Sequence, residues 1–278
     1  MLFRCVLLIL SMLLPACNLS KPTLSPTDTV SATLESPTEP VISPTETPSD
    51  ETEIPTERWL TIEDGLEMRT YIPNDAEISQ LTVIRIDPTK YHFRAVYRAG
   101  DPLNIVDWQV AEPEAHVIIN SNFFTAENQV LGLLVSDGQV SGNAYTDRGG
   151  TFLVQNGILS MRGNIAYPYQ GEPLEQAIQG FPMLVENGQA TFFNTSGDKR
   201  TRRTVIAQDS DGQILLMATP YFGITLADLS AYLPTTDMNI VTAFNLDGGG
   251  STMMAATDAD YVLHSFDPVP AVLAVYRR

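Results

Sequence analysis

The chain has 278 residues, a formal net charge of −17 at pH 7 and a sequence pI of about 4.4. A protein this acidic is a poor candidate for nucleic-acid binding, because Lys and Arg contacts to phosphate dominate that affinity. The length accommodates one sizeable domain with extensions, or two small domains.

The first residues have the features of an export signal. Met1 to Arg4 is short and positive, and Cys5 to Leu14 is apolar but too short to span a membrane. Leu14-Pro15-Ala16-Cys17 resembles a bacterial lipobox, which predicts a lipoprotein signal peptide over residues 1–16 and lipidation of the Cys17 thiol. The alternative is an ordinary signal peptide cleaved near Ala16. We expect a lipid-anchored, extracytoplasmic protein of the bacterial cell envelope that meets the membrane only through its lipid.

Residues 17–57 are dense in Pro, Thr, Ser and acidic residues, and Ser-Pro-Thr recurs at Ser25, Ser36 and Ser43. Such a segment buries too little apolar surface to offset the entropy of ordering it. We interpret it as a disordered tether and expect the folded domain to span residues 58–278.

The region after residue 58 is predominantly strand-like. Leu81 to Ile86 and Tyr91 to Tyr97 alternate, and in the second run the odd-numbered apolar residues share one face. Tight hairpin turns favour Asn-Gly and Asp-Gly pairs. Four such pairs stand between apolar runs, at Asp137-Gly138, Asn156-Gly157, Asn187-Gly188 and Asp211-Gly212.

Two helices are expected among the strands. Thr225 to Asp228 has the pattern of a capping box, with leucines following at helical spacing. Asn104 and Asp107 indicate the start of a second helix, which Pro113 stops. The fold class is therefore predicted as α+β, with a mostly antiparallel or mixed β-sheet, several β-hairpins and a few packed helices in a single globular domain.

An apolar run from Ile240 to Leu246 predicts a buried strand that ends at Asp247, followed by Gly248, Gly249, Gly250 and Ser251. Glycines allow the backbone to approach a ligand closely, and successive N–H groups can form an anion-binding nest. The alternative is a turn that Asp247 closes by an Asx hydrogen bond. The segment lacks the Gly-Lys-Ser/Thr of a P-loop and the G-x-S-x-G of a nucleophile elbow.

A second strand is predicted to run from His116 into Asn120, Ser121 and Asn122. Alternation places the two asparagines on one side, where their amides suit a sugar hydroxyl or a phosphate oxygen. The alternative is that they cap a turn.

Lys199 to Thr204 is the only dense basic cluster in the chain. Arg binds phosphate through two parallel hydrogen bonds, so the cluster is a candidate phosphate site. The alternative is a solvated loop before a strand. Arg148, beside two glycines, is a weaker cationic candidate.

The motif LDGGGST, residues 246–252, resembles the signature of the phosphodiester glycosidase family, to which the lysosomal uncovering enzyme is related. The likeness continues in the family's order over roughly His116 to Tyr276. Asn120 to Phe124 is similar to an Asn-Gly-Gly-Phe-Phe segment, with Ser and Asn in place of the glycines, and Arg203-Thr204 is similar to an Arg-Thr pair at a strand start. Asp267 stands where a basic residue is expected.

The resemblance implies a surface-anchored glycoside hydrolase that releases a sugar from a sugar-1-phosphate diester, in phosphate-linked glycans of the cell envelope or of exopolysaccharide. Asp247 would be a catalytic carboxylate. A second carboxylate is not identified, so a retaining or inverting outcome stays open. The residues expected to contact substrate or phosphate are Asn120, Asn122, Arg203, Thr204, Gly248, Gly249, Gly250 and Ser251.

Other functions stay open: a non-catalytic carbohydrate-binding lipoprotein, a phosphodiesterase that cleaves the P–O bond, or a structural envelope protein. His92, His116 and His264 lack the spacing of a metal pair, and no cofactor motif is evident. A divalent-cation requirement, the natural sugar and aglycone, and the oligomeric state are open.

Overall fold

The computed structural model describes residues 55–73, 77–193 and 196–278, all within one compact unit. The expected signal peptide, Cys17 and most of the expected tether lie outside these residues, and the single-domain organisation stays a prediction. Thr70 N and Arg69 Nε donate to the carbonyls of Pro55 and Thr56, each at 3.0 Å. The folded region therefore includes residues on the tether side of the boundary expected at Arg58.

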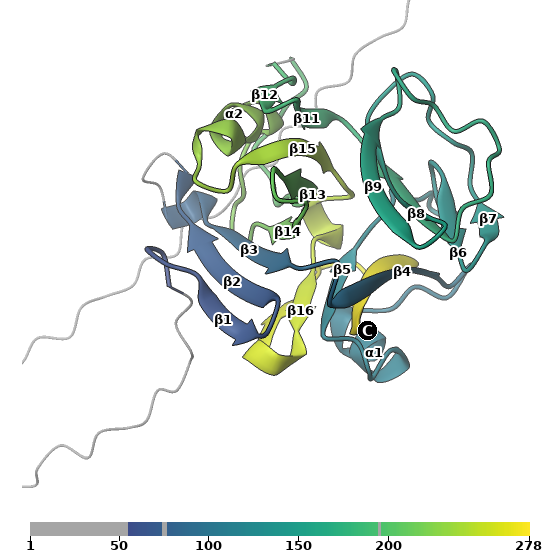
Figure 1. Ribbon diagram of the computed structural model, residues 1–278, viewed down its shortest axis with the longest axis horizontal. Coiled ribbons are helices and arrows are strands. Elements are labelled where there is room, and N and C mark those ends of the chain that lie inside the picture. Colours follow the sequence, from purple (N-terminus) through teal and green to yellow (C-terminus); the bar gives the residue numbers. More distant parts are fainter. Residues whose placement is uncertain (1–54, 74–76, 194–195) are drawn as a thin grey trace, which may run out of the picture. The chain divides into compact units, whose positions relative to one another are not determined.

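The described residues form three sheets, and every strand pair in them is antiparallel (Figure 1). The largest has eight strands in the order β1 (Leu60–Glu63), β2 (Leu66–Tyr71), β3 (Leu81–Ile86), β14 (Ile214–Ala218), β13 (Thr204–Asp209), β15 (Ile240–Asn245), β11 (Met183–Glu186) and β12 (Gln189–Ala190). The second has five strands in the order β7 (Gln139–Ser141), β6 (Leu134–Ser136), β10 (Gln176–Gly180), β8 (Gly150–Gln155) and β9 (Ile158–Gly163). The third has β17 (Tyr261–Leu263), β16 (Met254–Ala256), β5 (Val117–Asn120), β18 (Ala271–Arg277) and β4 (Tyr91–Tyr97).

Two α-helices occur in the described residues, α1 (Ile105–Ala111) and α2 (Leu226–Tyr232). Asn104 caps α1 by accepting from two backbone N–H groups, and the Thr225 hydroxyl caps α2 by accepting from Asp228 N. Both predicted starts are confirmed. Short 3₁₀ turns are η2 (Glu77–Ser79), η3 (Leu233–Thr235), η4 (Gly249–Ser251) and η5 (Thr257–Ala259). The described fold is thus mostly β, and the mixed pairing that the sequence allowed does not occur in it.

Three of the four predicted tight turns are confirmed. Asp137, Asn156 and Asn187 have positive φ, as do the glycines that follow them. The fourth turn is wider, because the carboxylate of Asp209 accepts from the N–H groups of Asp211 and Gln213 and so closes a longer loop between β13 and β14.

The main core lies between the sheets. Phe93, Phe152, Ile206 and Phe244 are buried in one cluster, although β4, β8, β13 and β15 belong to three different sheets. The predicted face of β4 is confirmed, since Tyr91, Phe93 and Ala95 are buried and the intervening His92 is exposed.

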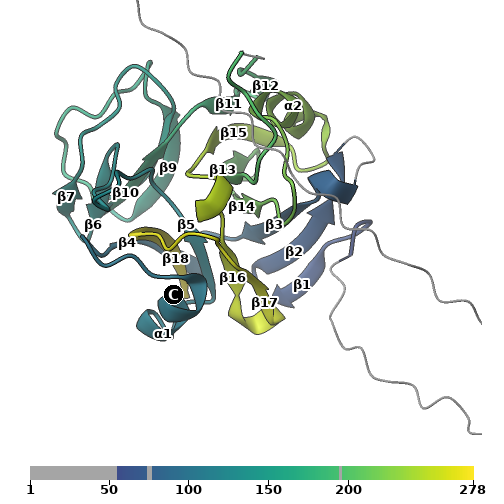
Figure 2. The ribbon, with the colours of Figure 1, turned by 180° about the vertical axis from the view of Figure 1, so that it is seen from behind.

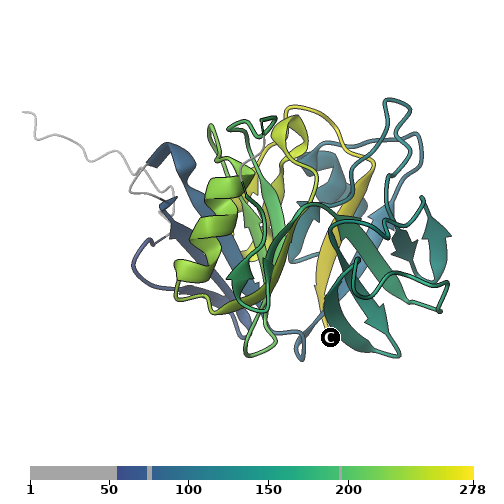
Figure 3. The ribbon, with the colours of Figure 1, turned by 90° about the horizontal axis from the view of Figure 1, so that it is seen from above.

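Each helix covers the other face of one sheet. Leu229 of α2 packs with Val205 and Ala207 of β13, and Figure 3 shows α2 outside the eight-stranded sheet. Trp108 of α1 packs with Ile118 of β5, and Figure 2 shows α1 beside this third sheet. No helix in the described part of the chain is long and apolar enough to cross a membrane.

The contact between β10 and β15 is close enough to require glycine. A Cβ added at Gly180 would lie 2.2 Å from the carbonyl oxygen of Asn245. We expect Gly180→Ala to lower the free energy of unfolding by about 1–3 kcal/mol, the usual cost of overpacking. Gly197 has open space around its Cβ position and no positive φ, so Gly197→Ala is the matched control. Urea denaturation of both variants tests this, and equal stability would contradict it.

Candidate functional site

The side chain of Asn120 joins two sheets at the end of β5. It is buried, with 1% of its surface exposed. Its Oδ1 accepts from Thr204 Oγ1 at 2.9 Å and from Met253 N at 3.0 Å, and its Nδ2 donates to the carbonyl of Asp247 at 2.7 Å. One amide therefore fixes the start of β13 and both ends of the LDGGGST segment. All of these partners belong to the protein, so the expected contact of Asn120 and Thr204 with substrate stays a prediction.

Asp247 follows β15 and is partly exposed. Burial raises the pKa of its carboxyl from 3.8 to about 6, and the negative charge of Asp267 adds to the increase. Hydrogen bonds from the Ser251 side chain and from Gly248 N, the latter 2.9 Å from Oδ1, act in the opposite direction. A carboxyl with a pKa near 6 exchanges a proton close to neutral pH, as acid–base catalysis requires.

The glycine segment forms the 3₁₀ turn η4. Gly249 has φ 62°, a left-handed conformation that suits glycine. The N–H of Gly248 donates to Asp247 Oδ1, and the N–H of Gly249 donates to the carbonyl of Arg202. These two N–H groups already bond within the protein, which favours a turn closed by Asp247 over an anion nest at these positions.

Asp267 is the carboxylate beside this turn. A Cβ added at Gly250 would lie 1.9 Å from Asp267 Oδ2, so the absence of a side chain at Gly250 leaves room for the carboxylate. The sequence marked Asp267 only as a departure from a basic residue. Its effect on the pKa of Asp247 makes it the candidate for the second carboxylate, which no motif near it could have indicated.

The two buried arginines of the basic cluster line different cavities. Arg203 donates to Asp198 Oδ1 at 3.2 Å and to the carbonyls of Lys199 and Ile224, and it borders a cavity of about 240 Å³ that includes no residue of the signature. Arg202 borders a cavity of about 480 Å³ together with Gly249 and Gly250. The sequence favoured Arg203 for phosphate, but the structure places Arg202 beside the glycine turn.

Asn122 lies beyond the end of β5. Its Nδ2 donates to the carbonyls of Leu131 and Leu133, at 3.2 and 3.0 Å, in a side chain that is 2% exposed. Because β5 ends at Asn120, the strand alternation that placed both asparagines on one side does not extend to Asn122. Its observed bonds close the loop that leads to β6, and its expected contact with substrate stays a prediction.

The loop that carries Tyr145 and Arg148 is one that the sequence barely marked. Burial raises the pKa of Tyr145, the charge of Arg148 opposes the increase, and the charge of Asp247 adds to it. Arg148 pairs with Asp147, and its guanidinium lies 5.7 Å from the ring centroid of Phe181. Gln179, fully buried, accepts from Tyr145 N at 2.7 Å and so holds this loop on β10.

A second group of ionisable residues lies at the other end of β5. His116 Nδ1 is 2.5 Å from Asp258 Oδ2 and 3.7 Å from Glu63 Oε2. These three residues have ligand atoms close enough to share a metal ion, and imidazole and carboxylate suit Zn²⁺. Glu63 also accepts from Tyr91 and Arg277, so protein donors already occupy part of this group. The sequence missed it because its members come from three distant segments.

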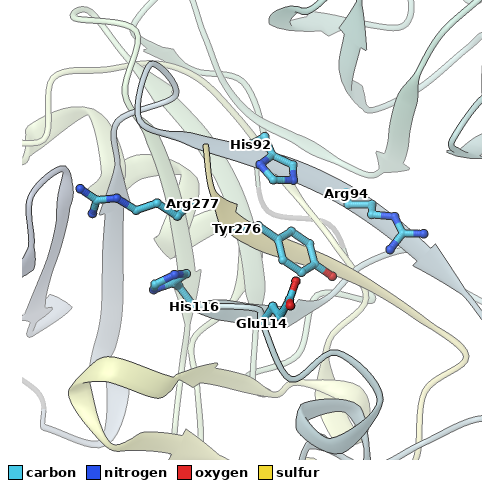
Figure 4. Close-up of a pocket in the computed structure, with 6 residues that line it drawn as sticks. All are labelled: His92, Arg94, Glu114, His116, Tyr276 and Arg277. Atoms are coloured by element: carbon cyan, nitrogen blue, oxygen red, sulfur yellow. The ribbon is translucent and has the colours of Figure 1, made fainter.

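His116 also borders a cavity of about 380 Å³, drawn in Figure 4 with His92, Arg94, Glu114, Tyr276 and Arg277. His92 stacks on Tyr276, with ring centroids 5.2 Å apart. Figure 4 shows the guanidinium groups of Arg94 and Arg277 pointing to opposite sides. Each already has a carboxylate partner, Asp137 for Arg94 and Glu63 for Arg277, so neither brings an uncompensated charge to this cavity.

Comparisons with known proteins identify the family and the fold of the chain. A sequence profile of phosphodiester glycosidases matches residues 113–276. Among curated proteins no sequence matches the chain significantly. Several solved structures have a similar fold, among them the following three. The catalytic domain of zebrafish N-acetylglucosamine-1-phosphodiester alpha-N-acetylglucosaminidase, auto-inhibited by its pro-peptide, has a TM-score of 0.59 at 16% identity over 81% of this chain and 87% of that one.

Two further structures of similar fold are bacterial. A hypothetical protein from Synechocystis has a TM-score of 0.53 at 17% identity over 77% of this chain and 62% of that one. An exported protein from Burkholderia pseudomallei K96243 has a TM-score of 0.52 at 12% identity over 76% and 74%. At these identities the likeness shows the fold.

The raised pKa of Asp247 predicts a pH-dependent stability. The folded state holds the proton more tightly than the unfolded chain, so this contribution is fully present below pH 3.8 and is lost as pH rises through about 6. Asp247→Asn keeps a neutral group at every pH. It should therefore raise the free energy of unfolding above about pH 7, by up to about 3 kcal/mol, with no gain near pH 4.

Urea denaturation across this pH range measures the effect. Asp260→Asn is the control, because Asp260 is exposed and has φ 51°, which Asn adopts readily. A gain for Asp247→Asn that is the same at low and high pH would contradict the shifted pKa.

Proposed function

Since the chain belongs to the phosphodiester glycosidase family, we propose that it hydrolyses the glycosidic bond of a sugar-1-phosphate diester, with Asp247 as a catalytic carboxylate. The observation that carries the proposal is the raised pKa of Asp247, at a strand end held by Asn120 and beside a second carboxylate, Asp267. The zebrafish enzyme of similar fold acts, by its name, on an N-acetylglucosamine-1-phosphodiester, which supports this substrate class.

Hydrolysis breaks the bond between the anomeric carbon and the phosphate oxygen. Water supplies the oxygen that joins the sugar, and the bonding electrons leave with the phosphomonoester. A phosphate leaving group is stable as an anion, so it needs little help from a general acid. Ionised Asp247 serves as the nucleophile or as the base that takes the proton of water, the two roles that glycosidase carboxylates fill.

Asp267 is proposed as the second carboxylate. Burial raises the pKa of Asp247 to about 6, and the charge of Asp267 adds to this increase, so that proton exchange falls near neutral pH. Asp267 N donates to the carbonyl of Gly250 at 3.1 Å, and the absence of a side chain at Gly250 leaves room for the Asp267 carboxylate beside the turn that follows Asp247. A pair of carboxyl groups is the usual requirement for glycosyl transfer to water.

The natural substrate is proposed to be a phosphate-linked glycan of the cell envelope or of exopolysaccharide, reached from a lipid anchor at Cys17. Support for the anchor comes from the lipobox-like sequence alone. Metabolic labelling with an alkyne fatty acid tests it: we expect label in the wild type and none in Cys17→Ala, with equal expression. Label that persists in Cys17→Ala would contradict the anchor.

Turnover tests the central proposal. Incubated with the methyl phosphodiester of N-acetylglucosamine-1-phosphate, the wild type should release free sugar and methyl phosphate, resolved by mass. Asp247→Asn should lower kcat by about a thousand-fold or more, because it removes the ionisable group. Asp260→Asn should retain wild-type turnover. Wild-type turnover in Asp247→Asn would refute the role of Asp247, and sugar-1-phosphate as product would indicate a phosphodiesterase.

The pH profile tests Asp267 separately. Because Asp247 acts ionised, kcat/KM should rise with pH through about 6. Asp267→Asn removes a negative neighbour, so it should move this rise to lower pH, and it should lower kcat by about a hundred-fold. A rise at unchanged pH would show that Asp267 does not act on Asp247.

A further inference from the structure

The cavity beside the glycine turn has an apolar rim. Its volume is about 480 Å³, within the range of small-molecule sites. Three aromatic side chains border it and are largely exposed: Tyr221 at 58%, Phe222 at 74% and Phe266 at 80%. We call these three residues the aromatic rim. Exposed apolar groups gathered at one cavity indicate a binding surface more than scattered ones do.

The floor of the same cavity includes a buried cation. Arg202 is 5% exposed, and its guanidinium donates to the carbonyls of Thr219, Thr252 and His264 at 3.4, 2.6 and 2.8 Å. Within the described ranges no carboxylate lies within 4.0 Å of it, whereas buried Arg203 pairs with Asp198. Burial lowers the pKa of Arg202, as it does that of Arg203, but only Arg203 has a carboxylate whose charge acts against the decrease.

A buried charge without a partner is costly, and an anion supplied by a ligand removes that cost. Carbonyl oxygens satisfy hydrogen bonds of Arg202 but bring no net charge. The same guanidinium lies over the ring of Phe266, 4.8 Å from its centroid, so the cation and the aromatic rim meet at one place. The cavity therefore offers a positive centre and an apolar surface to one ligand.

The walls are held in place by close backbone contacts. Thr201 and Ile224 form an isolated β-bridge, and a Cβ at Gly223 would lie 1.7 Å from the carbonyl of Thr201. Arg200 Nη1 donates to the carbonyl of Gly223 at 2.8 Å. The segment that carries Tyr221 and Phe222 is thus fixed to the segment that carries Arg202.

We propose that this cavity is the subsite for the leaving phosphomonoester, in which Arg202 pairs with the phosphate and the aromatic rim holds an apolar ring of the alcohol esterified to it. This assignment rests on the proposed function and adds a substrate class, a sugar-1-phosphate diester whose aglycone carries an apolar ring near the phosphate. Gly249 and Gly250 border this cavity and also form part of the turn that follows Asp247. A phosphate in the cavity therefore lies next to the catalytic carboxylate. Ring stacking on exposed aromatic side chains supplies the selectivity.

Binding of two phosphomonoesters tests the subsite without requiring turnover. By calorimetry, benzyl phosphate should bind the wild type about tenfold more tightly than methyl phosphate, the scale of one ring contact. Phe222→Ala and Phe266→Ala should each reduce that ratio to about threefold or less, with methyl phosphate unaffected. Tyr167→Ala, an exposed aromatic residue outside the cavity, is the control and should keep the wild-type ratio. Equal affinity for both esters in the wild type would overturn the aromatic part of the proposal.

The phosphate contact has its own test. Arg202→Met should weaken both esters by about tenfold or more, and Arg202→Lys, which keeps the charge and the burial, should retain part of the affinity. Thermal unfolding checks that both variants are folded. Unchanged affinity in folded Arg202→Met would overturn the role of Arg202.

These outcomes separate the two proposals. Neither ester has a glycosidic bond, so ring-selective binding without turnover of the methyl diester would contradict the proposed function and leave the cavity as a phosphomonoester-binding site. Turnover of the methyl diester without ring-selective binding would support the proposed function and overturn the aromatic part of the subsite.

Discussion

The carboxamide of Asn120 is the contact on which the site depends. It is buried, and its bonds to Thr204, Asp247 and Met253 join two sheets to both ends of the glycine segment. A buried amide of this kind must satisfy its hydrogen bonds, because leaving them unmade costs more than forming them gains. The requirement fixes where β15 ends and where the turn begins, and so fixes where the Asp247 carboxyl lies.

Two ionisable groups beside that turn, Asp247 and Arg202, are destabilised in their charged forms. Burial disfavours the charged form of both Asp247 and Arg202. It therefore raises the pKa of Asp247 and lowers that of Arg202. Neither group has an oppositely charged side chain among its contacts in the described ranges, although the chain forms such pairs elsewhere, as between Arg203 and Asp198. The proposed phosphate substrate would account for both groups, because its negative charge would compensate Arg202 while Asp247 gains or loses a proton. Perturbed groups gathered at one place are typical of functional sites.

The sequence predicted the features that depend on neighbours along the chain. The strands Leu81–Ile86 and Tyr91–Tyr97 and both helix caps follow from alternation and capping, which are local. The direction of an arginine side chain is not read from spacing: besides Asp198, Arg203 bonds the carbonyl of Ile224, which the fold brings to it from 21 residues along the chain. The second carboxylate and the group of Glu63, His116 and Asp258 come from segments that only the folded sheet brings together, so no spacing could indicate them.

The proposed reaction cleaves the carbon–oxygen bond of a sugar-1-phosphate diester, and the fate of the water oxygen tests this most directly. The methyl phosphodiester of N-acetylglucosamine-1-phosphate would be hydrolysed in water enriched in oxygen-18, and the methyl phosphate would be examined by mass spectrometry. Cleavage at the anomeric carbon leaves the phosphate oxygens untouched, so unlabelled methyl phosphate is expected. One labelled oxygen in the methyl phosphate would mean that water attacked phosphorus, and would refute cleavage at the anomeric carbon.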